Sequence, residues 1–148
     1  MGFTTQSGAG FGYVVSAGSD LLVKVRVGAD GRLAFTTDGD TTRYIDLNDP
    51  ANPATAGANA GKNPQGIVVD AAGRRAYVAN FVSRNVSVVD LPNDRVIATI
   101  RTSAPAAAGS IGQVVSVGAE MFFSSRGNFD RPAGAVVSTN ERVSQAGW

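Results

Sequence analysis

The sequence lacks two residue types that carry much of enzyme and metal chemistry: none of its 148 residues is cysteine or histidine. Disulfides, thiolate nucleophiles and Ser–His or Cys–His catalytic pairs are therefore excluded. Zinc, copper and haem lose their usual side-chain ligands for the same reason. The absence of cysteine does not by itself assign a redox compartment.

The sequence also has no large excess of charge of one sign and no long apolar run. Thirteen Lys and Arg balance twelve Asp and Glu, and the formal net charge is +1. This balance indicates neither a nucleic-acid surface nor a polybasic membrane anchor. No apolar run approaches the roughly 20 residues of a membrane span. Residues 1–10 lack the charged and apolar regions of a signal peptide, so we expect none.

The residues that are present suit a globular chain with many turns. Hydrophobic residues make up 43% of the sequence, which also contains 18 glycines and 6 prolines. A chain of this length normally forms one domain with its own core.

Residues 63–102 contain the clearest pattern. It predicts four short strands separated by turn-forming residues, at positions 66–70, 75–81, 85–91 and 95–100. Four antiparallel strands in about 40 residues have the size of one propeller blade. The apolar runs Ile67–Val69 and Val88–Val89 are typical of strands covered on both faces, as in stacked blades. A four-stranded meander in a sandwich or barrel is the alternative.

This segment resembles the YVTN family of β-propeller repeats. The family pattern runs Asn-Pro-x-Gly, an apolar strand, Gly-(Lys/Arg)-Arg-Ala-Tyr-Val-x-Asn, and a strand ending Val-(Ile/Val)-Asp-Leu. The matching residues are Asn63, Pro64, Gly66, Gly73, Arg74, Arg75, Ala76, Tyr77, Val78, Asn80, Ser83, Val86, Val88, Asp90 and Leu91. The resemblance implies a propeller fold, and propellers host many activities.

The N-terminal part contains a second, weaker copy of the pattern. Tyr13 and Ser19 match Tyr77 and Ser83 at an offset of 64 residues, which requires insertions near 28–40 and 48–60. Residues 42–47 then form the fourth strand, and residues 2–10 form a loose strand or arm. A competing register, with offsets of 42 and 44, would make residues 30–47 most of a degenerate blade. We favour the first register, because it places Gly-Lys-Asn-Pro at the start of a blade.

The period of the sequence changes after residue 102. Residues 103–109 are a linker, and the next residues predict an amphipathic helix opened by a capping box of Ser110 and Gln113. Its apolar face comprises Ile111, Val114, Val115, Gly118, Met121 and Phe122. A second capping box, Ser138 with Glu141, predicts a short helix that ends near Gly147.

The first of these helices resembles the N-terminal helix of the haem domain in di-haem cytochrome c peroxidase-like proteins. Gly118, Met121, Phe122 and Phe123 carry the match to a Gly-x-x-Leu-Phe-Phe helix that precedes a Cys-x-x-Cys-His motif. The sequence contains no such motif, so the resemblance implies haem c only in a downstream part and no cofactor in this chain. Met121 is interpreted as a packing residue rather than an axial ligand.

Together these features predict a mainly β chain of about two four-stranded antiparallel propeller blades with a short α-helical C-terminal extension. The expected divisions are a partial YVTN-type β-propeller at 1–102, the linker at 103–109 and the helical start of a cytochrome c-like domain at 110–148. Because a propeller needs at least about four blades, this incomplete one requires other chains or the rest of a parent chain. A homo-oligomer is one way to supply them.

Three functions are consistent with this organisation. The first is a non-catalytic scaffold and docking segment of a secreted or periplasmic haem-containing oxidoreductase, involved in electron transfer through its parent protein. The alternative is a cell-surface or extracellular propeller module that binds a protein or glycan partner without chemistry. The third is a hydrolase, for which the available acids, Asp70, Asp90, Asp94 and Glu141, show no close pairing and read better as turn or cap residues.

The candidate docking residues, all expected to be exposed, are Arg74, Arg75, Arg84, Asn85 and Arg126. Ordinary solvated loop charge is the alternative interpretation of each. Asn63 and Asn80 are expected to hold turns, and Asp38–Asp40 to be turn residues rather than a calcium site. Trp148 has no role that the sequence reveals.

Overall fold

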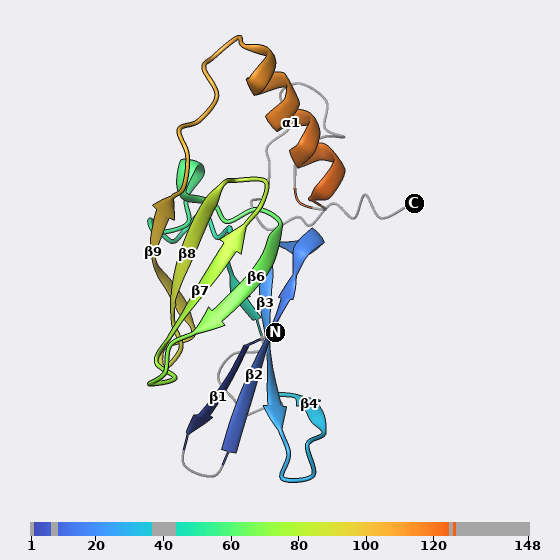
Figure 1. Cartoon of the computed structure of the whole chain (residues 1–148), viewed down its shortest axis with the longest axis vertical. Helices are drawn as coiled ribbons and strands as arrows, with labels where there is room; N and C mark the ends of the chain where they lie inside the picture. Colours follow the sequence, from blue (N-terminus) through green and yellow to red (C-terminus); the bar gives the residue numbers. More distant parts are fainter. Residues whose placement is uncertain (1, 7–8, 37–43, 125, 127–148) are drawn as a thin grey trace.

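The computed structural model describes residues 2–6, 9–36, 44–124 and 126. Within these residues the chain forms two antiparallel sheets followed by one α-helix, so the predicted mainly β class and helical extension are confirmed (Figure 1). The arrangement of the two sheets as blades of a propeller remains a prediction. Residues 38–40, the capping box at 138–141 and Trp148 lie outside the described residues.

The second sheet contains the four strands predicted for residues 63–102. They are β6 (Pro64–Val69), β7 (Arg75–Asn80), β8 (Asn85–Asp90) and β9 (Arg95–Arg101), paired in chain order. In the β6–β7 turn, Gly73 has a φ of 64°, a conformation that glycine adopts at little cost. The Asp70 carboxylate accepts the backbone N–H groups of Arg74 and Arg75 at 2.7 and 3.1 Å. Asp70 is therefore a turn residue, as predicted.

The first sheet contains β1 (Gly2–Gln6), β2 (Ala9–Ser16), β3 (Leu21–Val27), β4 (Leu33–Phe35) and β5 (Tyr44–Asp46). A 3-10 turn, η1 (Ala17–Ser19), joins β2 to β3, and another, η2 (Gly57–Asn59), lies in the connection to the second sheet. Both β4 and β5 pair with β3, one after the other along its length, so the sheet is four strands wide. Of the expected loose strand or arm at residues 2–10, the strand is confirmed, but it is not loose, since β1 pairs with β2 over five residues.

The central strand pairs of the two sheets, β2–β3 and β7–β8, repeat each other at the favoured offset of 64 residues. Ser16 pairs with Leu21 as Asn80 pairs with Asn85. The turn before the third strand contains a left-handed residue in both sheets, Asp20 at a φ of 55° and its equivalent at 51°. The competing register, which made residues 30–47 a separate blade, is wrong because β4 and β5 belong to the first sheet.

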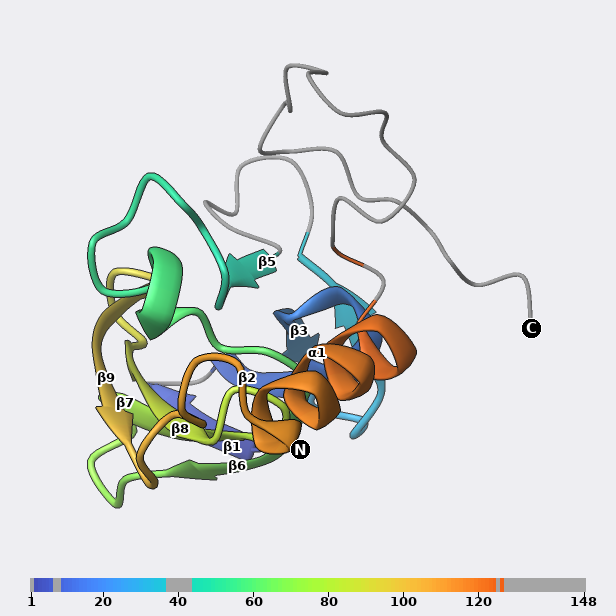
Figure 2. The same ribbon diagram turned by 90° about the horizontal axis from the view of Figure 1, so that it is seen from above.

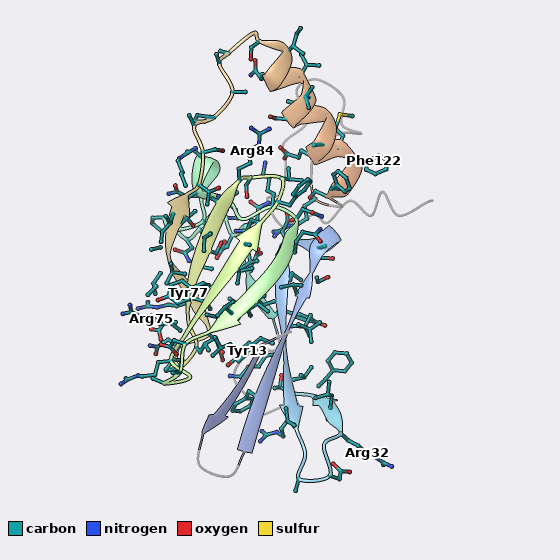
Figure 3. All side chains as sticks on the ribbon, viewed as in Figure 1. Tyr13, Arg32, Arg75, Tyr77, Arg84 and Phe122 are labelled. Carbon is teal, nitrogen blue, oxygen red and sulfur yellow. The ribbon has the colours of Figure 1, made fainter. Side chains whose placement is uncertain are left out.

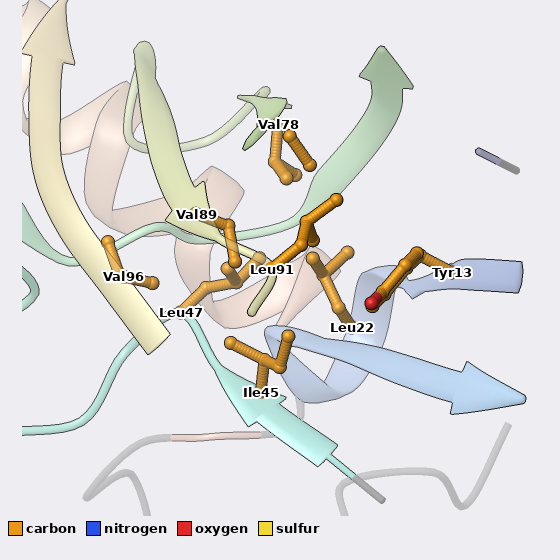
Figure 4. Packing of buried hydrophobic residues seen from close by; sticks show 9 residues of the cluster. Tyr13, Leu22, Ile45, Leu47, Val78, Val89, Leu91 and Val96 are labelled. Atoms are coloured by element: carbon orange, nitrogen blue, oxygen red, sulfur yellow. The ribbon is translucent and has the colours of Figure 1, made fainter. Parts of the chain in front are cut away.

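The core lies between the sheets, which pack face to face (Figures 2 and 4). The first sheet and its following residue contribute Tyr13, Leu22, Ile45 and Leu47, and the second sheet with Leu91 contributes Ala76, Val78, Val89 and Val96. Strand β6 lies against β1 and β2, and β9 lies against β5. At Gly2 the approach is close, because an added Cβ would lie 2.8 Å from a methyl group of Val69. Tight packing of small and branched side chains thus holds the sheets together.

Helix α1 (Ile111–Phe123) follows a connection, residues 102–110, that contains no strand or helix, as expected for a linker. The predicted cap is confirmed: the Ser110 side chain accepts the N–H of Gln113 at 3.2 Å, and the Gln113 side chain accepts the N–H of Gly109. The helix lies beyond one end of the second sheet (Figure 1). None of its residues is buried, and Met121 is 50% exposed. The expectation that Met121 is a core residue is therefore wrong within this chain.

Candidate functional site: docking surfaces and a buried polar cluster

A buried carboxylate, Asp20, connects the first sheet to the second sheet and to the helix. Asp20 is completely buried, and its Oδ1 accepts the backbone N–H of Asn63 at 2.8 Å. Its Oδ2 accepts the Asn48 side chain at 3.0 Å and the Ser124 hydroxyl at 3.3 Å. Burial raises the pKa of Asp20, while these hydrogen bonds and the charge of Arg126 oppose that rise. Every contact joins a different segment, so the group positions β6 and the end of α1.

Two ion pairs hold the same end of the molecule. The guanidinium of Arg126 donates to both carboxylate oxygens of Asp46, at 2.5 and 3.0 Å. Lys62 pairs with Glu120 of α1. A bidentate pair of this kind fixes the orientation of both side chains. The helix is therefore attached to the sheets by polar contacts at its C-terminal half.

A second polar network occupies the buried face of the second sheet. The Asn80 amide donates to Asn85 Oδ1 at 2.8 Å and to the Ser87 hydroxyl at 2.9 Å. Asn85 in turn donates to the carbonyl of Ala60 at 2.9 Å. Asn85 is 2% exposed, so its prediction as an exposed docking residue is wrong. Its amide instead holds the β7–β8 turn against the loop that precedes β6.

A groove at the opposite end of the second sheet contains two predicted docking residues. Arg74 and Arg75 lie there with Tyr77, and the groove has a volume of roughly 460 Å³. Both arginines are exposed, and Figure 3 shows Arg75 and Tyr77 on the same side of the sheet. Asp70 and Asp90 line the same groove, so two carboxylates balance its two guanidinium groups. Such a mixture of polar groups beside an aromatic ring can bind sugar hydroxyls or a peptide.

A second groove lies between α1 and the β7–β8 turn. Arg84 and Arg101 line it together with the Lys62–Glu120 pair, and its volume is roughly 300 Å³. Figure 3 places Arg84 between the sheet and the helix. The groove has more basic than acidic side chains, so it would attract an anionic group.

The predicted docking residues are thus not one site. Arg74 and Arg75 come together at one end of the second sheet, and Arg84 lies at the other. Asn85 is buried. The side chain of Arg126 is only 11% exposed, so the prediction that it is an exposed docking residue is also wrong. Its guanidinium group instead forms an ion pair with the Asp46 carboxylate.

The outer face of the second sheet, which points away from the first sheet, is an apolar surface of the kind that an incomplete set of stacked sheets leaves exposed. Burial alternates along β7, with Ala76, Val78 and Asn80 buried and the residues between them exposed. Large apolar side chains remain exposed on this face, at Val68 (68%), Tyr77 (39%), Ile97 (38%) and Ile100 (53%). Uncovered apolar sheet faces mark interaction surfaces. The continuous apolar run Ile67–Val69 was the signal available in the sequence, since such runs are typical of strands covered on both faces.

Helix α1 presents a second apolar surface. Its exposed apolar residues are Ile111, Val114, Val115, Val117, Met121, Phe122 and Phe123. Phe123 contacts the Phe81 ring edge-on, with centroids 5.8 Å apart. That contact, the Lys62–Glu120 pair and the Ser124 hydrogen bonds hold its C-terminal end, while its N-terminal turns project from the sheets.

In the described part of the chain, no group of three or more Asp and Glu side chains is placed to hold a metal ion. No helix there is long and apolar enough to cross a membrane.

Comparison with known proteins assigns neither a family nor an activity. No family model and no curated protein matches the sequence. The chain is similar to a solved structure described as a functionally unknown protein from Desulfotomaculum acetoxidans DSM 771, at 17% identity and a TM-score of 0.46. The match covers 65% of this chain and 25% of that protein, so the chain spans about a quarter of its length.

Proposed function

We propose that this chain is a non-catalytic segment of a β-propeller that serves as a scaffold and docking surface in a larger protein. One observation carries the proposal: the central strand pairs of the two sheets, β2–β3 and β7–β8, have the same register at an offset of 64 residues, and the sheets pack face to face. The stack leaves an apolar outer face on the second sheet. A radial array of such sheets would cover that face.

The state of the acidic residues supports a role without chemistry. Asp70 accepts turn amides, and Asp90 accepts the Asn93 side chain. Asp94 forms an ion pair with Lys24 at 2.7 Å. Among the described residues, each acid of the hydrolase hypothesis is therefore engaged in a turn or an ion pair. Glu141 lies outside the described residues.

Within this role, the parent protein is a secreted or periplasmic haem-containing oxidoreductase. The order of the two sequence resemblances supports this assignment, with the cytochrome-like helix directly after the blade. The exposed apolar surface of α1 also supports it, because a helix that begins a further domain needs a covering partner. The residues of this chain do not fit covalent haem, since it has no cysteine or histidine.

The experiment is to read the parent gene beyond the codon for Trp148 and to express the longer protein. We expect a Cys-x-x-Cys-His motif and haem absorbance that stays with the polypeptide after denaturation. A parent protein without the motif and without bound haem would overturn the redox assignment. That result would not affect the scaffold proposal, which measurements of association and unfolding test separately.

The second candidate function, an extracellular module that binds a protein or glycan, is favoured by the groove with Arg74, Arg75 and Tyr77. Its test is a glycan and acidic-peptide binding screen with Arg74→Ala and Arg75→Ala. Arg32→Ala is the matched control, because the Arg32 side chain is 89% exposed in another turn. Binding that only the groove variants abolish would favour this function. Absence of any binding would leave the redox scaffold.

A further inference from the structure

The stack of two sheets has two faces that point away from the packed interface, and both contain exposed large apolar side chains. One is the outer face of the second sheet, with Val68, Tyr77 and Ile100. The other is the far face of the first sheet, opposite the second sheet. Phe35 pairs with Val25, and Tyr44 pairs with Val23, on this far face. Phe35 is 61% and Tyr44 is 45% exposed.

The repeat relates these two faces to the interface already formed inside the chain. At an offset of 64 residues, Tyr77 on the outer face corresponds to Tyr13. Tyr13 is 1% exposed because the second sheet covers it. The outer face of the second sheet is therefore the equivalent of a surface that is buried by a neighbouring sheet.

The far face of the first sheet is equivalent to the covering surface. Its positions Gly12, Val14 and Val25 correspond to three positions at which the second sheet covers the first. The corresponding side chains are Ala76, Val78 and Val89, all completely buried. Gly12 corresponds to Ala76, which is also small, and the two valines of the far face each correspond to a valine. The far face thus has the residue types that cover an outer face.

We infer that the outer face of the second sheet binds the far face of the first sheet in a second copy of this chain. This inference rests on the proposed propeller scaffold and names the partner that continues it. Because the two surfaces differ, the contact is head-to-tail, and it either closes into a ring or extends. It continues the packing between the two sheets of one chain and covers Tyr77 and Phe35.

The test uses sedimentation velocity and light scattering of the full chain over a range of concentrations. We expect reversible association. Tyr77→Arg blocks the outer face and Phe35→Arg blocks the far face, so each variant alone should associate at least about tenfold more weakly. An equal mixture should form a one-to-one complex, because the mixture retains one intact pair of faces.

Ile111→Arg is the control, since Ile111 is 83% exposed on α1, away from both faces. It should leave association unchanged, and circular dichroism should show that all three variants are folded. Should Tyr77→Arg or Phe35→Arg not fold, Val68→Arg and Leu33→Arg replace them, because both residues are exposed on the same faces.

Three results would overturn the inference. A chain that stays monomeric at every concentration would show that a second copy does not cover the outer face. Association that Tyr77→Arg abolishes and Phe35→Arg leaves intact would indicate a symmetric contact between two outer faces. Failure of the mixed variants to assemble would contradict head-to-tail polarity. None of these results alters the haem test of the proposed function, so the two can fail separately.

Discussion

Tyr13 and Tyr77 occupy the same position in two successive sheets, yet Tyr13 is 1% exposed and Tyr77 is 39% exposed. The difference arises because the second sheet covers the first, while the second sheet is uncovered on its outer face. One tyrosine is thus a core residue and the other a surface residue of the same repeating unit. The two exposed fractions therefore show how much of Tyr77 a further sheet on the outer face would bury.

We therefore predict that Tyr13→Ala and Tyr77→Ala have very different effects in the isolated chain. Loss of the buried ring should lower the free energy of unfolding by about 3–5 kcal/mol, as for other buried aromatic residues. Loss of the exposed ring should lower it by less than about 1 kcal/mol. Urea unfolding followed by circular dichroism measures both. Equal effects would mean that the outer face is not free in the isolated chain.

The ion pair between Lys24 and Asp94 should stabilise the contact between the sheets. Lys24 donates to both oxygens of Asp94, at 3.0 and 2.7 Å, and the two side chains are only 12% and 5% exposed. A double-mutant cycle with Lys24→Met and Asp94→Asn should give a coupling free energy of about 1.5–3 kcal/mol. The exposed pair of Arg32 and Asp30 is the control and should give under about 1 kcal/mol. Similar values for both pairs would contradict this prediction.

Asp20 should make the stability of the chain fall with rising pH. Burial raises its pKa in the folded state, so its contribution is fully present below the unfolded value, about 3.9. That contribution is lost as the pH rises through the folded-state pKa. Asp20→Asn removes the titration, and asparagine tolerates the left-handed backbone found here. The unfolding free energy of the variant relative to the native chain should therefore increase with pH across this window.

Asp70 provides a control of opposite sign. Backbone N–H groups of Arg75 and Arg74 lower its pKa, so its contribution is present above the unfolded value and is lost as the pH falls through the folded-state pKa. The relative stability of Asp70→Asn should thus decrease as the pH rises through the acid range. Urea titrations from acid to neutral pH give both slopes. Slopes of the same sign would contradict the assignment of the two environments.

Asn85 should be a structural residue. Asn85→Ala leaves the buried Asn80 amide and the Ala60 carbonyl without one partner each, which should cost about 2–3 kcal/mol. Arg84→Ala changes the neighbouring exposed side chain and should cost about 1 kcal/mol or less. Thermal or urea unfolding measures the difference. A stable Asn85→Ala variant that loses binding to a partner would restore Asn85 as a docking residue.

The second sheet could be predicted from the sequence nearly strand by strand. Turn residues such as Asp70 and Gly73 mark its strand ends by local chemistry, and local chemistry is visible in a sequence. The offset of 64 residues was visible for the same reason, since Tyr13 and Tyr77 begin equivalent segments. The strand β4 was missed, because three residues in a Gly- and Asp-rich stretch resemble an insertion.

The site was harder to predict because its residues depend on long-range contacts. Asp20 looks like one more turn residue, and only the fold brings Asn63 and Ser124 to its carboxylate. Asn85 and Arg126 looked exposed because both are polar and near turns. Their burial follows from partners far away in the sequence, Ala60 for one and Asp46 for the other.

The most direct test of the account is the reactivity of a single cysteine on the outer face. The chain contains no cysteine, so Val68→Cys gives one thiol at a position that is 68% exposed in the isolated chain. Arg32→Cys is the exposed control. The rate of maleimide modification should be measured in the dilute monomer and in the assembled protein, whether copies of the chain or the intact parent. We predict that assembly slows modification at position 68 by at least about tenfold and leaves position 32 unchanged. Equal rates at position 68 in the monomer and in every assembly would contradict the account.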